Sequence, residues 1–349
     1  MSDTFAAGHG IPATTMDNLA EKFRFSGVDT LSRQTVTDLF EAEYVYCRGR
    51  LDEALALANA LLEDDRETIR VSALTYRMVI SVAREDVDQA YEDYTLLEHL
   101  CREGIEHGRG DMQFGVGPYV LSAMIIEKTL LKPLFELPDL ATDAESFPYG
   151  LRQYFGYHFA LRQVFEGDFD RALGLADAFK LLVQPDFPES QVYLYLTSAI
   201  AHVMACRPDE AREEYTRAWE LGQQHGIIMP FVETYGCMLG LQRSCFDAQG
   251  YDQYRKVEAM ARKFRRGRAG LQQRCGMRES VVRLTQLECD TMGLAALGWS
   301  NRQIAQQLGI SENTVRNHLT SGYQKMNIHS RKELRANAMP AQWAIARIL

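Results

Sequence analysis

Residues 284–334 read LTQLECDTMGLAALGWSNRQIAQQLGISENTVRNHLTSGYQKMNIHSRKEL. Three positions in this stretch pair a hydroxyl residue with an acid or an amide three residues later: Thr285 with Glu288, Ser300 with Gln303 and Ser330 with Glu333. At this spacing the two side chains cap each other's free backbone amides at the start of a helix. The stretch therefore predicts several short helices with defined first turns.

Glycine marks the turns between these helices. Gly298 and Gly309 stand where the first two helices should end, because glycine adopts the left-handed conformation at little cost. Ser311 can cap a third, longer helix that we expect from about Glu312 to Met326. The resulting order of helix, Gly-Trp-Ser turn, helix, Gly-Ile-Ser turn and helix is that of a helix-turn-helix unit.

The third helix has two chemically different faces. Apolar positions at helical spacing predict that it packs on the preceding helix, with Val315, Leu319, Tyr323 and Met326 against Ile304, Ala305 and Leu308. The opposite face carries no carboxylate and consists of Asn313, Arg316, Asn317, Thr320 and Gln324. Such side chains donate to guanine, pair with adenine or contact phosphate. A solvated amphipathic helix is the alternative, but the order of caps and turns favours a recognition helix in the major groove.

The stretch resembles the DNA-binding domain of the LuxR/FixJ (GerE-type) family of transcription regulators. The residues that carry the resemblance are Leu284-Thr285, Glu288, Gly298, Ser300-Asn301, Ile304-Ala305, Leu308, Ile310-Ser311, Thr314-Val315, His318, Lys325 and Ser330-Arg331. They span about 50 of the 349 residues. The resemblance implies a four-helix domain whose third helix enters the major groove, with His318 as a scaffold or backbone contact.

The family pattern and the polar face together predict the DNA contacts. We expect base readout by Arg316, Asn317, Thr320 and Asn313. We expect contacts to the DNA backbone, or positioning, by Asn301, Arg302, Ser311, Thr314, Lys325 and Arg331. Arg316 stands where the family usually has lysine, and its guanidinium adds a two-pronged donor. Thr320 replaces a residue that is often basic, so phosphate attraction should be weaker there.

Three residues depart from the family pattern. Leu287 and Cys289 stand in the first helix where a charged run is usual. Gly322 occupies a position that is usually apolar, at a cost of roughly 1 kcal/mol in helix propensity relative to alanine. We therefore expect a domain of lower stability than its relatives.

Charge divides the chain into two parts. Residues 255–349 contain 17 Lys and Arg against 6 Asp and Glu, which gives a net charge of +11. Residues 1–254 contain 21 against 41, a net charge of −20. A basic C-terminal quarter on an acidic body is typical of a polyanion-binding module attached to a regulatory domain. The basic segment 255–278 either contacts phosphates or docks on the acidic body, and the sequence leaves both open.

The N-terminal part predicts helical hairpins. A six-residue pattern with a turn residue first and, except in the last copy, alanine last recurs at 49–54, 167–172 and 206–211 and, more loosely, at 85–90 and 249–254. The pattern resembles the joint of the tetratricopeptide family, whose stacked hairpins bind partners in a concave groove. The long gap between the second and third copies along the chain predicts a degenerate hairpin near residues 120–140. An irregular bundle that serves only dimerisation is the alternative.

These patterns predict an all-α chain of five segments. They are a flexible leader (1–29), a tetratricopeptide-like sensor or interaction domain (30–265), a basic linker (266–280), a LuxR-type helix-turn-helix domain (281–340) and an apolar C-terminal helix (341–349). The start of the chain lacks the features of a signal peptide, and no run is apolar enough to cross a membrane. Seven cysteines without zinc spacing suit buried thiols in a reducing cytoplasm.

No enzymatic motif stands out in the sequence. It has no Walker A loop, no receiver pattern and no His-Glu-x-x-His, so we expect neither an enzyme nor a cofactor nor a metal. The expected function is a cytoplasmic transcription regulator that binds an inverted repeat in double-stranded DNA as a homodimer. Expected further partners are RNA polymerase and a peptide, protein or small-molecule effector of the helical domain. The alternative is a scaffold or adaptor protein that does not bind DNA.

Overall fold

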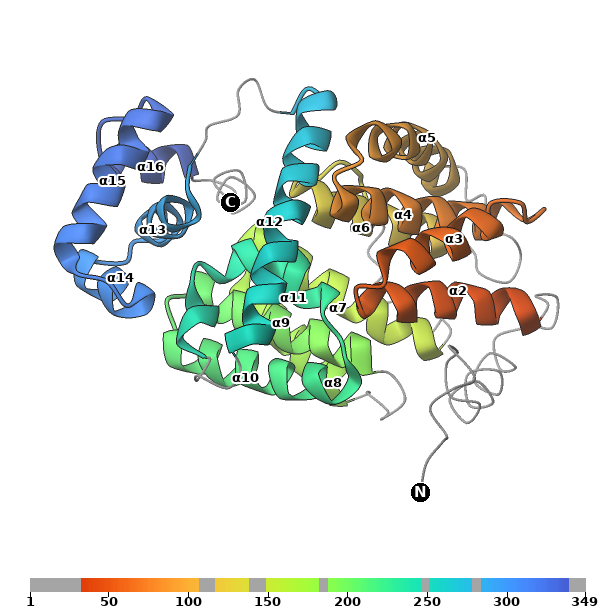
Figure 1. Ribbon diagram of the computed structural model, residues 1–349, viewed down its shortest axis with the longest axis horizontal. Coiled ribbons are helices and arrows are strands. Elements are labelled where there is room, and N and C mark those ends of the chain that lie inside the picture. Colours follow the sequence, from red (N-terminus) through yellow and green to blue (C-terminus); the bar gives the residue numbers. More distant parts are fainter. Residues whose placement is uncertain are drawn as a thin grey trace.

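The computed structural model describes residues 33–106, 117–137, 149–181, 188–245, 251–277 and 284–338. Within these ranges the chain forms fifteen α-helices and two 3-10 helices and no strand, which confirms the all-α prediction (Figure 1). The predicted leader and the apolar tail at 341–349 lie outside the described residues. No helix within these ranges is long and apolar enough to cross a membrane.

We call residues 33–277 the body and residues 284–338 the head. The body contains α2 (Arg33–Cys47), α3 (Leu51–Leu61), α4 (Glu67–Arg84), α5 (Val87–Glu106), α6 (Gly117–Leu130), α7 (Tyr149–Glu166), α8 (Phe169–Leu181), α9 (Pro188–Met204), α10 (Pro208–His225), α11 (Met229–Thr234), η3 (Tyr235–Met238), η4 (Leu241–Ser244) and α12 (Tyr251–Arg274). The head contains α13 (Gln286–Ala296), α14 (Asn301–Leu308), α15 (Glu312–Met326) and α16 (Arg331–Ala338).

Four of the recurring patterns form the joints of helical hairpins. The first residue of each pattern, Gly49, Glu85, Gly167 and Cys206, has a left-handed backbone with φ of 73°, 65°, 89° and 60°. The alanine at the end of each pattern is fully buried against the partner helix: Ala54, Ala90, Ala172 and Ala211. The pattern therefore reverses the chain and lets two helices approach closely. The finer resemblance to the tetratricopeptide family stays a prediction.

The region between the second and third patterns is less regular. The helix α6 occupies the place of the degenerate hairpin predicted near residues 120–140. It ends before Leu131, whose φ is 52°, and no second helix follows in the described residues up to 137. The fifth pattern begins outside the described ranges, but its last residue, Tyr254, is buried in α12.

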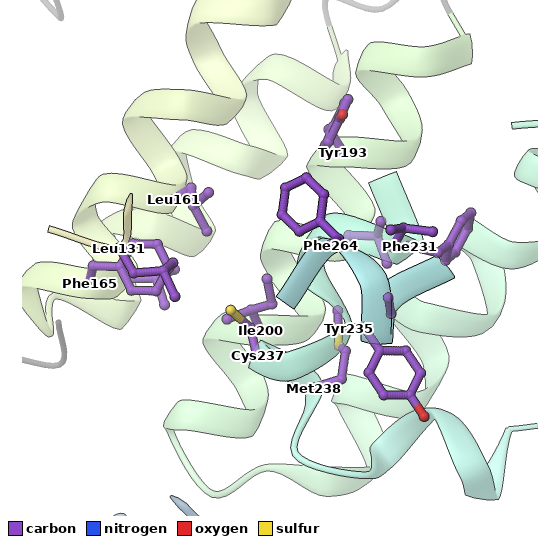
Figure 2. Close-up of a cluster of buried hydrophobic side chains, with 14 of the residues drawn as sticks. Leu131, Leu161, Phe165, Tyr193, Ile200, Phe231, Tyr235, Cys237, Met238 and Phe264 are labelled. Carbon is purple, nitrogen blue, oxygen red and sulfur yellow. The ribbon is translucent and has the colours of Figure 1, made fainter. Parts of the chain in front are cut away.

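The core of the body is apolar and joins helices that are distant in sequence. Figure 2 shows Phe231, Tyr235, Cys237 and Met238 in the same buried cluster as Ile200 of α9 and Phe264 of α12. The aromatic run of α7 contributes the buried Phe155, Tyr157 and Phe165 to the interior of the body. The prediction of buried thiols holds for Cys47, Cys101, Cys237 and Cys289, whereas Cys245 and Cys275 are half-buried and Cys206 is exposed.

The basic segment that follows the hairpins is mostly one long helix, α12, which packs on the hairpin helices α4 and α5. Arg266 pairs with Glu85 at 2.6 Å, and Arg274 pairs with Asp88 at 3.2 Å. Gly267 lies directly against the carbonyl oxygen of Val82, so a side chain at this position would clash with α4. Residues 266–274 of the predicted linker thus lie in α12, and only residues 275–283 separate α12 from the head.

Candidate nucleic-acid interface

The first two helices of the head begin at the predicted capping boxes. The Oγ1 of Thr285 accepts from the amide of Glu288 at 3.2 Å, and a Glu288 oxygen accepts from the amide of Thr285 at 2.7 Å. Ser300 and Gln303 make the same pair of bonds at 3.3 and 2.8 Å. Both caps are confirmed.

The fourth helix of the head begins differently from the prediction. The amide of Glu333 donates to the Oγ of Ser330 at 3.1 Å, as a capping box requires. The carboxylate of Glu333 accepts from the amide of His329 at 2.8 Å, one residue before the expected donor. The predicted box is therefore wrong in its second bond, although the same two side chains cap the helix.

The recognition helix predicted at 312–326 is α15, with the expected bounds. Ser311 caps it by accepting from the amide of Thr314 at 3.1 Å. Val315 and Leu319 are buried, as predicted for the inward face. Gly309 ends α14 in a left-handed conformation with φ of 65°, which completes the turn between α14 and α15. The local signals of the sequence are therefore sufficient to place this helix.

Gly322 lets α15 approach α13 closely. It is buried, and a Cβ at this position would lie 2.7 Å from the Sδ and 2.8 Å from the Cγ of Met292. Met292 is itself fully buried. The glycine in the interior of α15 is thus explained by packing, because α15 loses helix propensity at this position but gains a close contact with α13.

The outward face of α15 is open to solvent. All four residues predicted to read bases are exposed: Asn313, Arg316, Asn317 and Thr320. The hydroxyl of Thr320 donates its one proton to the carbonyl oxygen of Arg316 at 2.9 Å. The structure brings the four residues together on one face of one helix.

The residues predicted to contact the DNA backbone fall into two groups. Arg302 and Ser311 are exposed, and Thr314 lies beside Ser311 with their hydroxyl oxygens 2.8 Å apart. Arg331 and Asn301, by contrast, bind each other at 2.6 Å. Arg331 also donates to the carbonyl oxygen of Trp299 at 2.8 Å, so it ties α16 to the turn before α14.

Lys325 belongs to the second group, because it is held by Glu288. Its Nζ lies 2.8 and 2.7 Å from the two carboxylate oxygens, and Ser321 donates to the same group at 2.7 Å. Burial raises the pKa of Glu288, but the bonds from Lys325, Ser321 and the amide of Thr285 outweigh it and lower the pKa to about 2. Glu288 therefore stays ionised and clamps α15 onto α13.

Several residues that join the head to the body were not predicted. Arg265 of α12 donates to the Oε1 of Gln286 at 2.8 Å, and Arg243 of η4 lies 3.5 Å from the carboxylate of Asp290. These contacts join distant parts of the chain, and nothing in the sequence around the four residues indicates them. A nearby residue, Gly293, does give a local signal, because a glycine in the interior of a helix often marks a close packing contact.

Among the described residues, no cluster of His, Cys, Asp and Glu has a geometry that could hold a metal ion. The chemistry of the head is instead that of a cationic and amide-rich helix face. Such a face recognises the edges of base pairs and phosphate groups.

Comparison with known proteins identifies the head. Residues 282–338 match the family described as "Bacterial regulatory proteins, luxR family". The transcriptional regulatory protein DegU of Brevibacillus brevis is 39% identical over 64 residues, which cover 18% of this chain and 27% of DegU. The HTH-type transcriptional regulator MalT of Vibrio campbellii is 48% identical over 50 residues, which cover 14% of this chain and 6% of MalT.

The family match covers residues 282–338, and the matches to these relatives are short. The MalT protein of Vibrio cholerae is 46% identical over 50 residues, again 14% of this chain and 6% of the relative. The chain thus matches about a quarter of DegU or less than a tenth of the MalT proteins. No solved structure matches the chain. The family match and the geometry of α13 to α16 agree: residues 282–338 are a helix-turn-helix domain of the luxR family of bacterial regulatory proteins.

Proposed function

We propose that the protein is a DNA-binding transcription regulator whose helix α15 enters the major groove. The observation that carries this proposal is the exposed face of α15, which presents Asn313, Arg316, Asn317 and Thr320 without a carboxylate. The names of the DegU and MalT relatives, both transcriptional regulators, support it. The acidic body would not favour DNA by itself, so the head supplies the affinity.

Each exposed residue of α15 has a role that fits its chemistry. Arg316 can donate two hydrogen bonds to the O6 and N7 of a guanine, and Asn313 and Asn317 can pair with the N6 and N7 of an adenine. Thr320 uses its hydroxyl on the carbonyl oxygen of Arg316, so we assign its methyl group to the methyl group of a thymine.

The other predicted residues position this helix on the duplex. Arg302 and Ser311, which are exposed, would contact phosphates on either side of the groove. Lys325 binds Glu288 and Arg331 binds Asn301, and through these bonds the two cations would set the position of α15 within the head. Their replacement should weaken binding to all sequences alike, because it disturbs the position of α15 and not the reading of a base.

At the level of the whole chain, we propose a homodimer that binds an inverted repeat with half-sites about one helical turn apart. The helical body would respond to a peptide, a protein or a small molecule, and the bound regulator would act on RNA polymerase. The function requires no catalysis by the protein itself, and it places the protein in the cytoplasm with the DNA.

Selection of bound fragments from a random duplex library by the full chain tests this proposal. We expect enrichment of an inverted repeat, and binding of the enriched duplex that weakens steeply as salt rises, because phosphate contacts release counterions. An absence of enrichment together with a flat salt dependence would contradict the proposal and would favour a scaffold or adaptor role.

A further inference from the structure

The head is not merely tethered to the body, because a short segment of the body reaches into it. The helix α11 ends at Thr234 and continues through η3 and η4, residues 235–244, which we call the latch. Two consecutive residues of the latch, Leu239 and Gly240, have left-handed backbones with φ of 47° and 82°. This conformation is unfavourable for leucine and costs free energy that the surrounding contacts must offset.

The latch packs on the first two helices of the head. Leu239 is 0% exposed, and a Cβ at Gly293 of α13 would lie 2.5 Å from its Cδ2. Gly240 touches the side chain of Leu308 of α14 so closely that it has no room for a Cβ. The two glycines thus provide the space in which the latch and the head meet.

Three buried side chains at this contact each use one polar atom in a hydrogen bond and leave the other unbonded. Three side-chain atoms find no hydrogen-bond partner among the described residues: the Oε1 of Gln242, the Oδ2 of Asp290 and the Nε2 of Gln307. Arg243 approaches the Oδ2 of Asp290 only to 3.5 Å. Burial of an unbonded polar atom opposes docking, so these three atoms reduce the free energy that docking gains.

Docking also places the head beside the acidic body. Arg212 of α10 donates to the Oε1 of Gln307 of α14 at 3.3 Å, and its other nitrogen binds Asp209 at 2.5 Å. Residues 1–254 carry a net charge of −20, so a head that is held on the body lies in a negative field that opposes the approach of phosphates. The face of α15 itself stays open, so docking weakens DNA binding by repulsion and not by cover.

From these contacts we infer that the latch holds the head against the acidic body in a state of low DNA affinity, and that its release raises the affinity. This inference rests on the proposed DNA-binding function. It gives the body a means of control that involves no movement of the recognition helix within the head.

The latch is connected directly to the interior of the body. Glu233, the residue before the end of α11, accepts from the hydroxyl of Tyr46 at 2.5 Å and of Tyr193 at 3.0 Å. Lys128 of α6 binds the same carboxylate at 2.7 Å. Three helices of the body therefore fix the position of α11, and a shift of any of them moves the start of the latch.

One pair of variants opens the latch and controls for the change. Gly293→Ala places a Cβ against Leu239 while it favours the helical state of α13, so the head should still fold. Gly174→Ala in α8 is the matched control, because a Cβ there meets nothing within 4 Å. We expect Gly293→Ala, but not Gly174→Ala, to increase the radius of gyration of the full chain in small-angle scattering.

A second variant closes the latch covalently. The Sγ of Cys206 lies 3.7 Å from the carbonyl oxygen of Leu297 across the contact between body and head, so Leu297→Cys places a second thiol on the neighbouring residue for oxidation to a disulfide. The oxidant removes two electrons and two protons from the thiols, and a reductant restores them. Leu297→Cys combined with Cys206→Ser is the control, because it cannot form this bond.

The readout is the affinity of each full-length variant for a labelled mixed-sequence duplex in fluorescence anisotropy. We expect Gly293→Ala to bind at least about 5-fold more tightly than the wild type, and the difference to shrink at high salt. We expect oxidised Leu297→Cys to bind more weakly than the wild type and to recover on reduction.

Unchanged affinity in a Gly293→Ala protein that has expanded would overturn the inference and leave the proposed function intact. Absence of expansion would show that the head does not dock through Leu239, which also overturns it. If no variant binds any duplex, including those enriched by selection, the proposed function fails and the latch has no DNA binding to control.

Discussion

Two glycines in the head, Gly293 and Gly322, each allow a side chain from another segment to approach the helix closely. Both lie inside helices, where glycine costs roughly 1 kcal/mol relative to alanine. Gly322 faces Met292 within the head, whereas Gly293 faces Leu239 of the body. A glycine inside a helix can be recognised from the sequence at both positions. The neighbour that requires the space cannot, because it comes from another segment of the chain.

Replacement of Gly322 by alanine should destabilise the head. The added Cβ would lie within 2.8 Å of two atoms of the buried Met292, and overpacking of this kind costs about 1–3 kcal/mol. This exceeds the gain in helix propensity, so we expect a net loss of up to about 2 kcal/mol. Hydrogen exchange of the α15 amides in the full chain measures it.

Gly174→Ala is the control for this substitution, because the same gain in propensity meets no neighbour within 4 Å. It should raise the protection of amides in α8. Equal effects of the two substitutions would show that Met292 does not constrain Gly322.

Asp290 makes the docked state sensitive to pH. Burial raises its pKa to about 6 and outweighs the opposing effects of Arg243 of η4, Gln286 on its own helix and Arg265 of α12, whereas Glu258 of α12 adds to the rise. The pKa of the docked state lies above the ordinary value of 3.8, so docking binds a proton. Its contribution is present at low pH and is lost as the pH rises through about 6.

We therefore expect the wild type to be more compact near pH 5 than near pH 8, a range that spans the pKa of Asp290 of about 6. Asp290→Asn should stay compact and lose this dependence, since it imitates the protonated acid. Small-angle scattering over this pH range is the measurement. Asp170→Asn, at a side chain that is 88% exposed, is the control. A pH dependence that persists in Asp290→Asn would assign the effect to another group.

At the scale of single elements, local signals were sufficient for the helices of the head. The bounds of α15, Glu312–Met326, follow from the cap at Ser311 and from the apolar spacing on its inward face. Caps act over one turn of chain, so the sequence contains both partners. The contacts of η4 with α13 and α14 join segments far apart in sequence, and no local pattern predicts them. For the same reason, the roles of Lys325 and Arg331 inside the head were visible only in the structure.

The clamp between α13 and α15 gives a second, opposite pH dependence. The pKa of Glu288 is lowered to about 2 from 4.5, so its stabilising effect is present above pH 4.5 and is lost as the pH falls towards 2. Glu288→Gln removes a charged partner of Lys325, which should cost about 1–3 kcal/mol near neutral pH.

Hydrogen exchange of the α13 and α15 amides tests this prediction. The difference between Glu288→Gln and the wild type should shrink as the pH falls below 4.5, the ordinary pKa of the carboxyl. Glu63→Gln, at an exposed position of the body, should show no such difference. A difference in amide protection that does not change with pH would show that the shape of the Glu288 side chain, and not its charge, stabilises the contact between α13 and α15.

At the scale of the whole molecule, the basic C-terminal part of the chain lies in contact with the acidic N-terminal part. The head lies at one side of the molecule, with α13 between α15 and the long helix α12 (Figure 1). Part of the basic charge of α12 is paired with the body, as in the ion pair of Arg266 with Glu85. The sequence left open whether this segment binds phosphates or docks, and the described contacts of α12 are those of docking. The distribution of charge along the sequence predicted two parts of opposite sign, but only the structure shows that they are in contact.

The proposed function depends on α15 reading duplex DNA through its exposed face. The most direct test is the affinity of the full chain for its best selected duplex, measured by fluorescence anisotropy for Arg316→Ala. Arg102→Ala, which removes an exposed arginine of α5 on the body, is the control. We predict that Arg316→Ala costs about 1–3 kcal/mol and relaxes the preference at one base pair, while Arg102→Ala binds as the wild type does. Equal affinity of Arg316→Ala and the wild type would contradict the claim.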